Sequence, residues 1–222
     1  MANPVVKNYV DAALAQLRRG DLMRVPAKVP NEMRDGSIPA RGDWIGWQAI
    51  PSTVTSEDLD VLESELGLVF PPLYRDFLQY MHFFGLTEFG VRFEQHLPGE
   101  WIKKLRRLYS WYREQITRMH LLPIGDESMM DAGPVCFDTR ARDDDGDCPI
   151  VFWDHEWVGS DREVQPMFSS FGKILQCLTI VASADSIGTK TDDGRWMQAF
   201  LTADPTGAGG PARDYWTSSV SK

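Results

Sequence analysis

The chain has 222 residues, of which 43% are hydrophobic and 25% are charged. This composition is typical of a globular protein and excludes a disordered, collagen-like or coiled-coil chain. A formal net charge of -9 disfavours contact with phosphate backbones, so we expect no nucleic-acid partner. No apolar run reaches the roughly 18 residues that a membrane span needs, and the first residues lack the apolar core of a secretory signal. We therefore expect a cytoplasmic protein without a membrane partner.

The first 43 residues are expected to form a helical arm outside the main domain. Apolar residues recur at helical spacing between residues 4 and 19, and Gly20 stands where such a helix ends. Glycines and prolines interrupt residues 20–43, a pattern that indicates a loop without packed elements.

Three helices are expected in the first half of the main domain. Thr55 and Asp58 have the spacing of a capping box. A proline pair at 71–72 predicts the start of a second helix, whose apolar spacing continues to Gly85. Pro98 opens a third, longer helix with a basic outer face, which we interpret as an ordinary solvent-exposed face.

In the second half of the chain the hydrophobic period becomes that of strands. Runs at 121–124, 134–137 and 149–153 predict meander or hairpin strands, because turn residues bound each of them. A last helix is expected to begin after Ser169 or Ser170.

These elements predict an α+β fold, an antiparallel sheet flanked by helices, in a domain of residues 44–184. The first 43 residues form the arm, and residues 185–222 form a C-terminal tail. In this tail Trp196, Met197, Phe200 and Leu201 have the spacing to dock as one short turn or helix.

Charge is distributed unevenly along the chain. Between residues 122 and 165 there are twelve acids and three bases, which accounts for the whole net charge of -9. These acids either keep the loops between strands hydrated or form a docking face for a basic partner, whose association they would speed. The predicted docking face contains eight acids and one aromatic anchor, Trp153, and consists of Asp126, Glu127, Asp138, Asp143, Asp144, Asp145, Trp153, Asp154 and Glu156.

Two segments invite a metal interpretation. The triplet 154–156, Asp-His-Glu, could hold a metal, but successive strand residues point to opposite faces. The acid-rich run 143–147 resembles a calcium loop, but Ala141 and Phe152 stand where an EF-hand needs ligands. We therefore expect no metal, no cofactor and no enzymatic activity; a metal-dependent hydrolase is the least favoured alternative.

The three cysteines, Cys136, Cys148 and Cys177, are far apart and form no Cys-x-x-Cys pair. This spacing argues against a zinc ribbon or a redox pair. We expect three free thiols that are at least partly buried, as is usual in a reducing compartment.

Several short motifs occur in a defined order within residues 44–182. They are Trp47, Leu62–Gly67, Phe70–Leu78, Leu122–Asp126, Phe137–Asp138, Pro149–Glu156, Ser170–Phe171 and Ile174–Leu175. Together they resemble the SUKH superfamily, which includes fungal Smi/Knr-type cell-wall-assembly regulators and bacterial toxin-immunity domains.

This resemblance implies a non-catalytic α+β module that binds another protein. The favoured hypothesis is an immunity protein that blocks a basic toxin domain, such as a nuclease or a deaminase, through the acidic face. The alternative is a regulatory scaffold of the Smi/Knr type. Whether the chain is a monomer or a dimer stays open.

Overall fold

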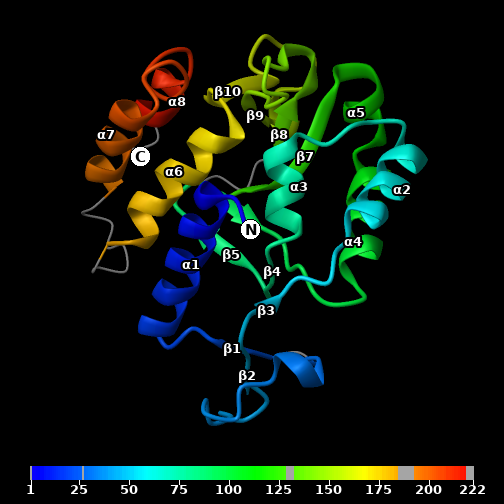
Figure 1. Cartoon of the computed structure of the whole chain (residues 1–222). Coiled ribbons are helices and arrows are strands. Elements are labelled where there is room, and N and C mark those ends of the chain that lie inside the picture. Colours follow the sequence, from blue (N-terminus) through cyan, green and yellow to red (C-terminus); the bar gives the residue numbers. More distant parts are fainter. Residues whose placement is uncertain (1, 27, 129–132, 185–192, 219–222) are drawn as a thin grey trace.

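The structure is a computed structural model and describes residues 2–26, 28–128, 133–184 and 193–218. Its centre is a six-stranded antiparallel sheet in the order β10-β9-β8-β7-β6-β5 (Figure 1). The strands are β5 (Leu86–Glu88), β6 (Val91–Phe93), β7 (Leu121–Glu127), β8 (Pro134–Asp138), β9 (Ile150–Trp153) and β10 (Val164–Phe168). The described residues also form eight α-helices, which confirms the α+β class. The strands expected after residue 120 are confirmed as β7, β8 and β9, whereas β5, β6 and β10 were not expected.

Side chains of the sheet alternate between its two faces, as the strand period requires. Phe137 and Phe152 belong to the main hydrophobic core, together with residues of α6 (Phe171–Ala182). A smaller cluster on the opposite face contains Leu121, Cys136 and Val151. The sheet is therefore buried on both faces near its middle.

α1 (Pro4–Arg19) packs along α6, as Figure 1 shows. Its predicted apolar stripe is buried: Val6, Tyr9, Val10 and Ala13. Three side chains of the following segment are buried as well: Met23, Val29 and Met33. The expectation that residues 20–43 form an unpacked loop is therefore wrong at these positions. Glycine and proline limit regular backbone structure there, but they leave single apolar side chains free to enter the core. The hydrophobic core thus crosses the boundary at residue 44, and the domain limits stay a prediction.

α2 (Ser56–Leu66) begins with the expected capping box. The backbone N–H of Asp58 donates to the Thr55 hydroxyl at 3.1 Å, and the N–H of Thr55 donates to the Asp58 carboxylate at 2.9 Å. Gly67 ends the helix with a φ of 66°, a left-handed conformation that glycine adopts without strain.

α3 (Pro72–Leu78) begins at the proline pair but ends well before Gly85. The chain then forms β4 (Met81–His82), which pairs with β3 (Ile50–Pro51). Phe83 continues in extended form and exchanges backbone hydrogen bonds with a residue after β6. The prediction that this helix continues to Gly85 was therefore wrong. Apolar residues of α3 and of the strand after it all face the same core, so their spacing in the sequence resembles that of one helix.

The predicted third helix is present in two parts, α4 (Trp101–Trp111) and α5 (Arg113–Met119). The break lies at Tyr112, whose φ and ψ are -99° and 27°. α4 and α5 lie beside α2 on one side of the molecule (Figure 1), and both contact β7.

β6 and β7 approach each other closely at Gly125. A Cβ atom at this position would lie 2.4 Å from the carbonyl oxygen of Arg92, a distance that no side chain tolerates. Glycine is therefore required for this pairing, which sets Ile124 and Asp126 beside β6.

The C-terminal segment forms α7 (Asp193–Ala203) and α8 (Arg213–Ser218). Asp204 is fully buried between them and accepts hydrogen bonds from the N–H and the hydroxyl of Ser169, at 2.8 and 2.6 Å. The indole N–H of Trp216 donates to a carbonyl of β10 at 2.9 Å. Of the side chains for which docking was expected, Trp196, Met197 and Phe200 are buried, and Leu201 is half-buried.

The remaining elements are short. They are β1 (Arg24–Val25), β2 (Ile45–Gly46), and the 3-10 helices η1 (Asn31–Met33), η2 (Thr139–Ala141) and η3 (His155–Trp157). All three cysteines are buried free thiols. Within the described ranges, we find no helix that is both long enough and apolar enough to cross a membrane.

Candidate functional site

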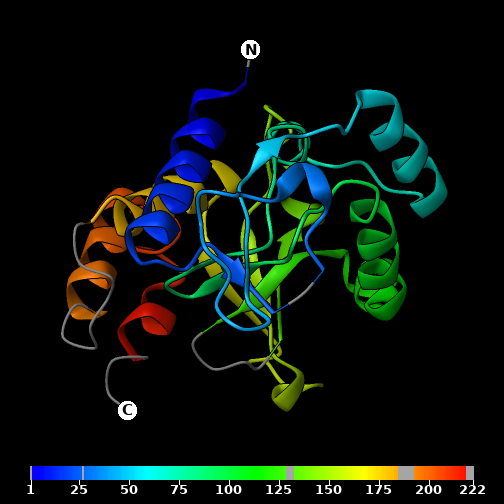
Figure 2. The same cartoon turned by 90° about the horizontal axis from the view of Figure 1, so that it is seen from below.

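The acids of the predicted docking face lie at opposite ends of the sheet. Residues 139–149 connect β8 to β9 at the end that contains Asp138 and Ile150, which lie close to one another in the sheet. Residues 154–163 connect β9 to β10 at the other end, where η3 projects from the lower edge of Figure 2. The two ends are separated by the length of β9, about 10 Å. The structure therefore brings the predicted residues together in two groups rather than on one continuous face.

The β8–β9 connection carries exposed acids on a loop held by hydrogen bonds. The Arg142 guanidinium donates to the carbonyl of Val69 at 2.7 Å and to that of Gly146 at 2.9 Å. Asp147 accepts the backbone N–H groups of Phe171 and Gly172, at 3.2 and 3.1 Å, and so caps α6. These contacts hold both ends of the loop against the body of the molecule.

Asp143, Asp144 and Asp145 are exposed on this loop. The Asp143 carboxylate accepts the N–H of Asp147 at 2.8 Å, whereas Asp144 and Asp145 form no ion pair or hydrogen bond in the described structure. We call the surface formed by these three acids the acid loop. Val69, which is 63% exposed, lies beside it.

Two acids of the predicted face are buried, so their assignment to a docking surface is corrected. Glu127 is fully buried and accepts the hydroxyl of Tyr215 at 3.0 Å. Asp154 is 4% exposed and caps η3 by accepting the N–H of Glu156 at 2.9 Å. Both carboxylates satisfy internal donors, because a buried carboxylate without partners costs several kcal/mol.

Of the other acids, Asp126 pairs with Arg92 at 3.1 Å. Asp138 pairs with Arg140 at 2.7 Å, and Arg140 holds the pKa of this carboxyl below its usual range against the opposing effect of burial. Glu156 is exposed on η3.

The expected anchor Trp153 is committed to internal contacts. Its indole N–H donates to Glu163 at 3.0 Å, and its ring meets that of Tyr112 edge-on at 6.2 Å. The next tryptophan, Trp157, is 44% exposed on η3. Trp153 therefore holds the start of the β9–β10 connection, and Trp157 is the tryptophan that a partner can reach there.

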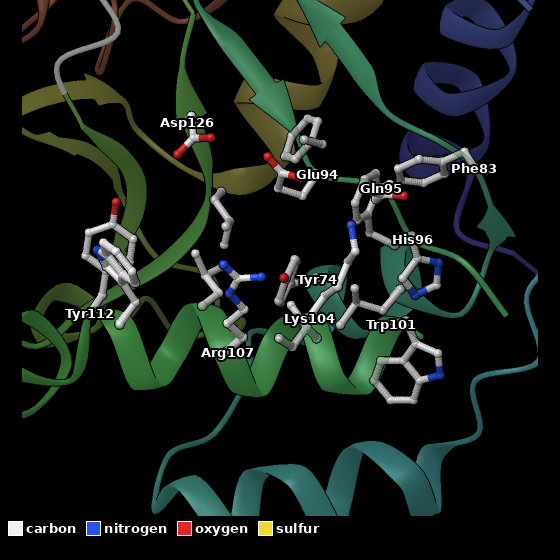
Figure 3. A pocket seen from close by; sticks show the side chains of 17 residues that line it. Tyr74, Phe83, Glu94, Gln95, His96, Trp101, Lys104, Arg107, Tyr112 and Asp126 are labelled. Carbon is white, nitrogen blue, oxygen red and sulfur yellow. The ribbon is translucent and has the colours of Figure 1, made fainter. Parts of the chain in front are cut away.

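Sequence reasoning missed a groove of about 320 Å³ between α4, α3 and the strands β6 and β7 (Figure 3). Its apolar lining comes from all three: Tyr74, Phe77, Leu78, Phe83, Phe93, Trp101, Leu105, Leu108 and Ile124. A volume of this size lies at the lower end of the range for ligand pockets. Of the residues predicted for the docking face, Asp126 alone lines this groove.

The two walls of the groove carry opposite charges. Figure 3 shows Lys104 and Arg107 rising from α4, with Glu94 and Asp126 on the opposite side. Burial lowers the pKa of Lys104, an effect that the Glu94 carboxylate counteracts. The sequence analysis predicted the basic helix that forms one wall of this groove. It did not predict β6, which forms the opposite wall.

Two histidines pack at one end of the groove. His82 and His96 stack with ring centroids 4.7 Å apart, and their Nδ1 atoms are 3.2 Å apart. The N–H of Thr53 donates to Nε2 of His82 at 3.0 Å, which fixes this nitrogen as an acceptor. Burial lowers both pKa values, that of His96 to about 3. The pair is therefore neutral near pH 7 and serves as packing.

The described residues contain no group of three or more His, Cys, Asp or Glu arranged to hold a metal ion. In the 154–156 triplet, Asp154 turns inward as a cap while His155 and Glu156 are exposed. The structure thus presents a charged exposed loop and an apolar groove, which are features of a surface that binds other molecules.

The fold places the chain among α+β domains, and a comparison with known families assigns it more narrowly. The model of the SMI1 / KNR4 family (SUKH-1) matches residues 53–177, more than half of the chain. The chain belongs to this family. No curated protein matches it.

Proposed function

We propose that this protein is an immunity protein, which binds a basic toxin domain through the acid loop and thereby occludes the toxin's own binding site. The family supplies the class, a protein-interaction module. The observation that carries the proposal is the pair Asp144 and Asp145, which are exposed and free of internal partners within the described structure, on a loop fixed at both ends.

A fixed, charged loop suits rapid and specific binding. A loop whose ends are already held loses little backbone conformational entropy on binding. Acids on a rim also raise the rate of encounter with a basic partner. Exposed Val69 beside the loop supplies apolar surface. The loop acids carry negative charge, as phosphates do, so they would occupy the basic surface with which a nuclease or deaminase holds nucleic acid.

The test is protection of growth in cells that express the toxin domain encoded beside this chain. The wild-type protein is expected to restore growth, and the double variant Asp144→Asn/Asp145→Asn to lose most of this protection. The matched control is Glu156→Gln/Asp161→Asn, which removes two exposed acids at the opposite end of the sheet. The wild type and both double variants should have equal melting temperatures, because none of the four substituted carboxylates forms an ion pair in the described structure.

Equal protection by both variants would contradict the proposal, as would loss of protection in the control alone. A genome without a toxin domain beside this chain would instead favour a regulatory scaffold of the Smi/Knr type.

A further inference from the structure

The groove between α4 and the sheet has properties that the acid loop does not explain. It is lined by aromatic and aliphatic side chains and is open to solvent. At its mouth Trp111 is 76% exposed. Tryptophan is enriched among the residues that dominate binding energy at interfaces, and an exposed tryptophan next to an apolar groove extends its apolar surface.

The bases of α4 divide into two pairs. Lys103 and Arg106 do not line the groove and form ion pairs, with Glu100 at 3.2 Å and with Glu65 at 2.8 Å. Lys104 and Arg107 line the groove, and neither forms an ion pair within the described residues. The fold therefore gives Lys103 and Arg106 carboxylate partners, whereas Lys104 and Arg107 face an apolar groove without one among the described residues.

Two neighbouring cations on one helix face repel each other, and an anion between them relieves this repulsion. On the facing wall Asp126 is engaged by Arg92 at 3.1 Å, and Glu94 is exposed. The α4 wall of the groove thus carries positive charge that no ion pair of the described residues offsets. An arginine guanidinium binds carboxylates in a bidentate geometry, so Arg107 suits a carboxylate ligand.

We propose that this groove docks an acidic segment of a partner protein, which inserts an apolar side chain over Leu105 and Leu108 and presents a carboxylate to Lys104 and Arg107. The surface shares no residue with the acid loop. The groove therefore selects an acidic segment, whereas the acid loop selects a basic surface, and the two are tested separately.

The experiment is a titration of isotope-labelled protein with short blocked peptides, followed by amide NMR. The probe is Asp-Trp-Asp. Matched peptides are Asn-Trp-Asn, which has the same shape without charge, Lys-Trp-Lys, and Asp-Gly-Asp, which lacks the apolar side chain. We expect Asp-Trp-Asp to shift amides of α4 and β6, with saturation below about 1 mM. The other three peptides should bind at least about tenfold more weakly.

The two matched double variants lie on the same helix, and each removes two positive charges. Lys104→Ala/Arg107→Ala should weaken Asp-Trp-Asp binding about tenfold, while Lys103→Ala/Arg106→Ala should leave it unchanged. The amides that shift in the wild-type protein locate the binding site without any substitution. This measurement therefore tests the site even if one of the variants does not fold.

Three results would overturn the proposal. One is the lack of saturable binding at about 1 mM. A second is equal binding of the charged and the neutral peptide. The third is a concentration-dependent shift of α4 and β6 amides without any peptide, because a second copy of the chain would then occupy the groove.

Discussion

A buried glutamate in the β5–β6 hairpin predicts an unusual dependence of stability on pH. Glu88 is 6% exposed. Burial raises the pKa of Glu88 from 4.5 to about 8. The folded chain therefore holds this carboxyl protonated at pH 7, whereas the unfolded chain ionises it.

The sign of the effect follows from proton binding. Between pH 4.5 and about 8, the folded state binds one more proton than the unfolded state, so the free energy of unfolding falls as pH rises. This contribution is complete below the unfolded pKa and is lost as pH passes through the folded pKa. With these two pKa values, the loss is about 2 kcal/mol between about pH 6 and pH 8.

The variant Glu88→Gln replaces the carboxyl with a neutral group of the same shape. Urea unfolding at about pH 6 and pH 8 should show a loss of about 2 kcal/mol in the wild type and little loss in the variant. Parallel stability curves for the two proteins across this range would refute the reasoning, because Glu88 would then titrate as in the unfolded chain.

Three further predictions concern stability and reactivity. Burial lowers the pKa of His96 from 6.5 to about 3, so the free energy of unfolding should fall as pH drops through this interval. The variant His96→Gln should show a smaller fall in an acid titration, and an equal fall would contradict this prediction. Asp204→Asn should cost about 2–4 kcal/mol in urea unfolding, because the amide nitrogen cannot accept the Ser169 donors; a cost no larger than that of Ser169→Ala would be inconsistent with this role. Burial raises the pKa of Cys148 to about 11, so native protein should react slowly with a thiol reagent and all three thiols should react in denaturant; fewer than three reactive thiols in denaturant would contradict the free-thiol state.

The sequence was sufficient to predict where a helix begins when residues close to that end form the cap. Thr55 and Asp58 cap α2, and Ser170 caps α6 through the N–H of Lys173 at 3.1 Å. These interactions lie within four residues, so their spacing is readable in the sequence. The order of such motifs also led to the correct family.

Tertiary packing decided what the sequence could not show. α3 ends at Leu78 because the next residues pair with β3, a contact that helical spacing does not encode. Glu127 belongs to an acidic stretch, yet a hydroxyl from α8 makes its burial possible. The groove depends on the approach of β6 to α4, and both strands of the β5–β6 hairpin were too short to predict.

The association rate with the toxin domain, measured as a function of salt concentration, tests the central claim most directly. If the acid loop steers a basic partner, the wild-type rate falls as salt rises, and Asp144→Asn/Asp145→Asn lowers it by up to about tenfold at low salt and flattens its salt dependence. Glu156→Gln/Asp161→Asn should retain the wild-type rate and slope. A wild-type rate and slope in the acid-loop variant, with loss of both in the control, would contradict the claim and place the binding surface at the opposite end of the sheet.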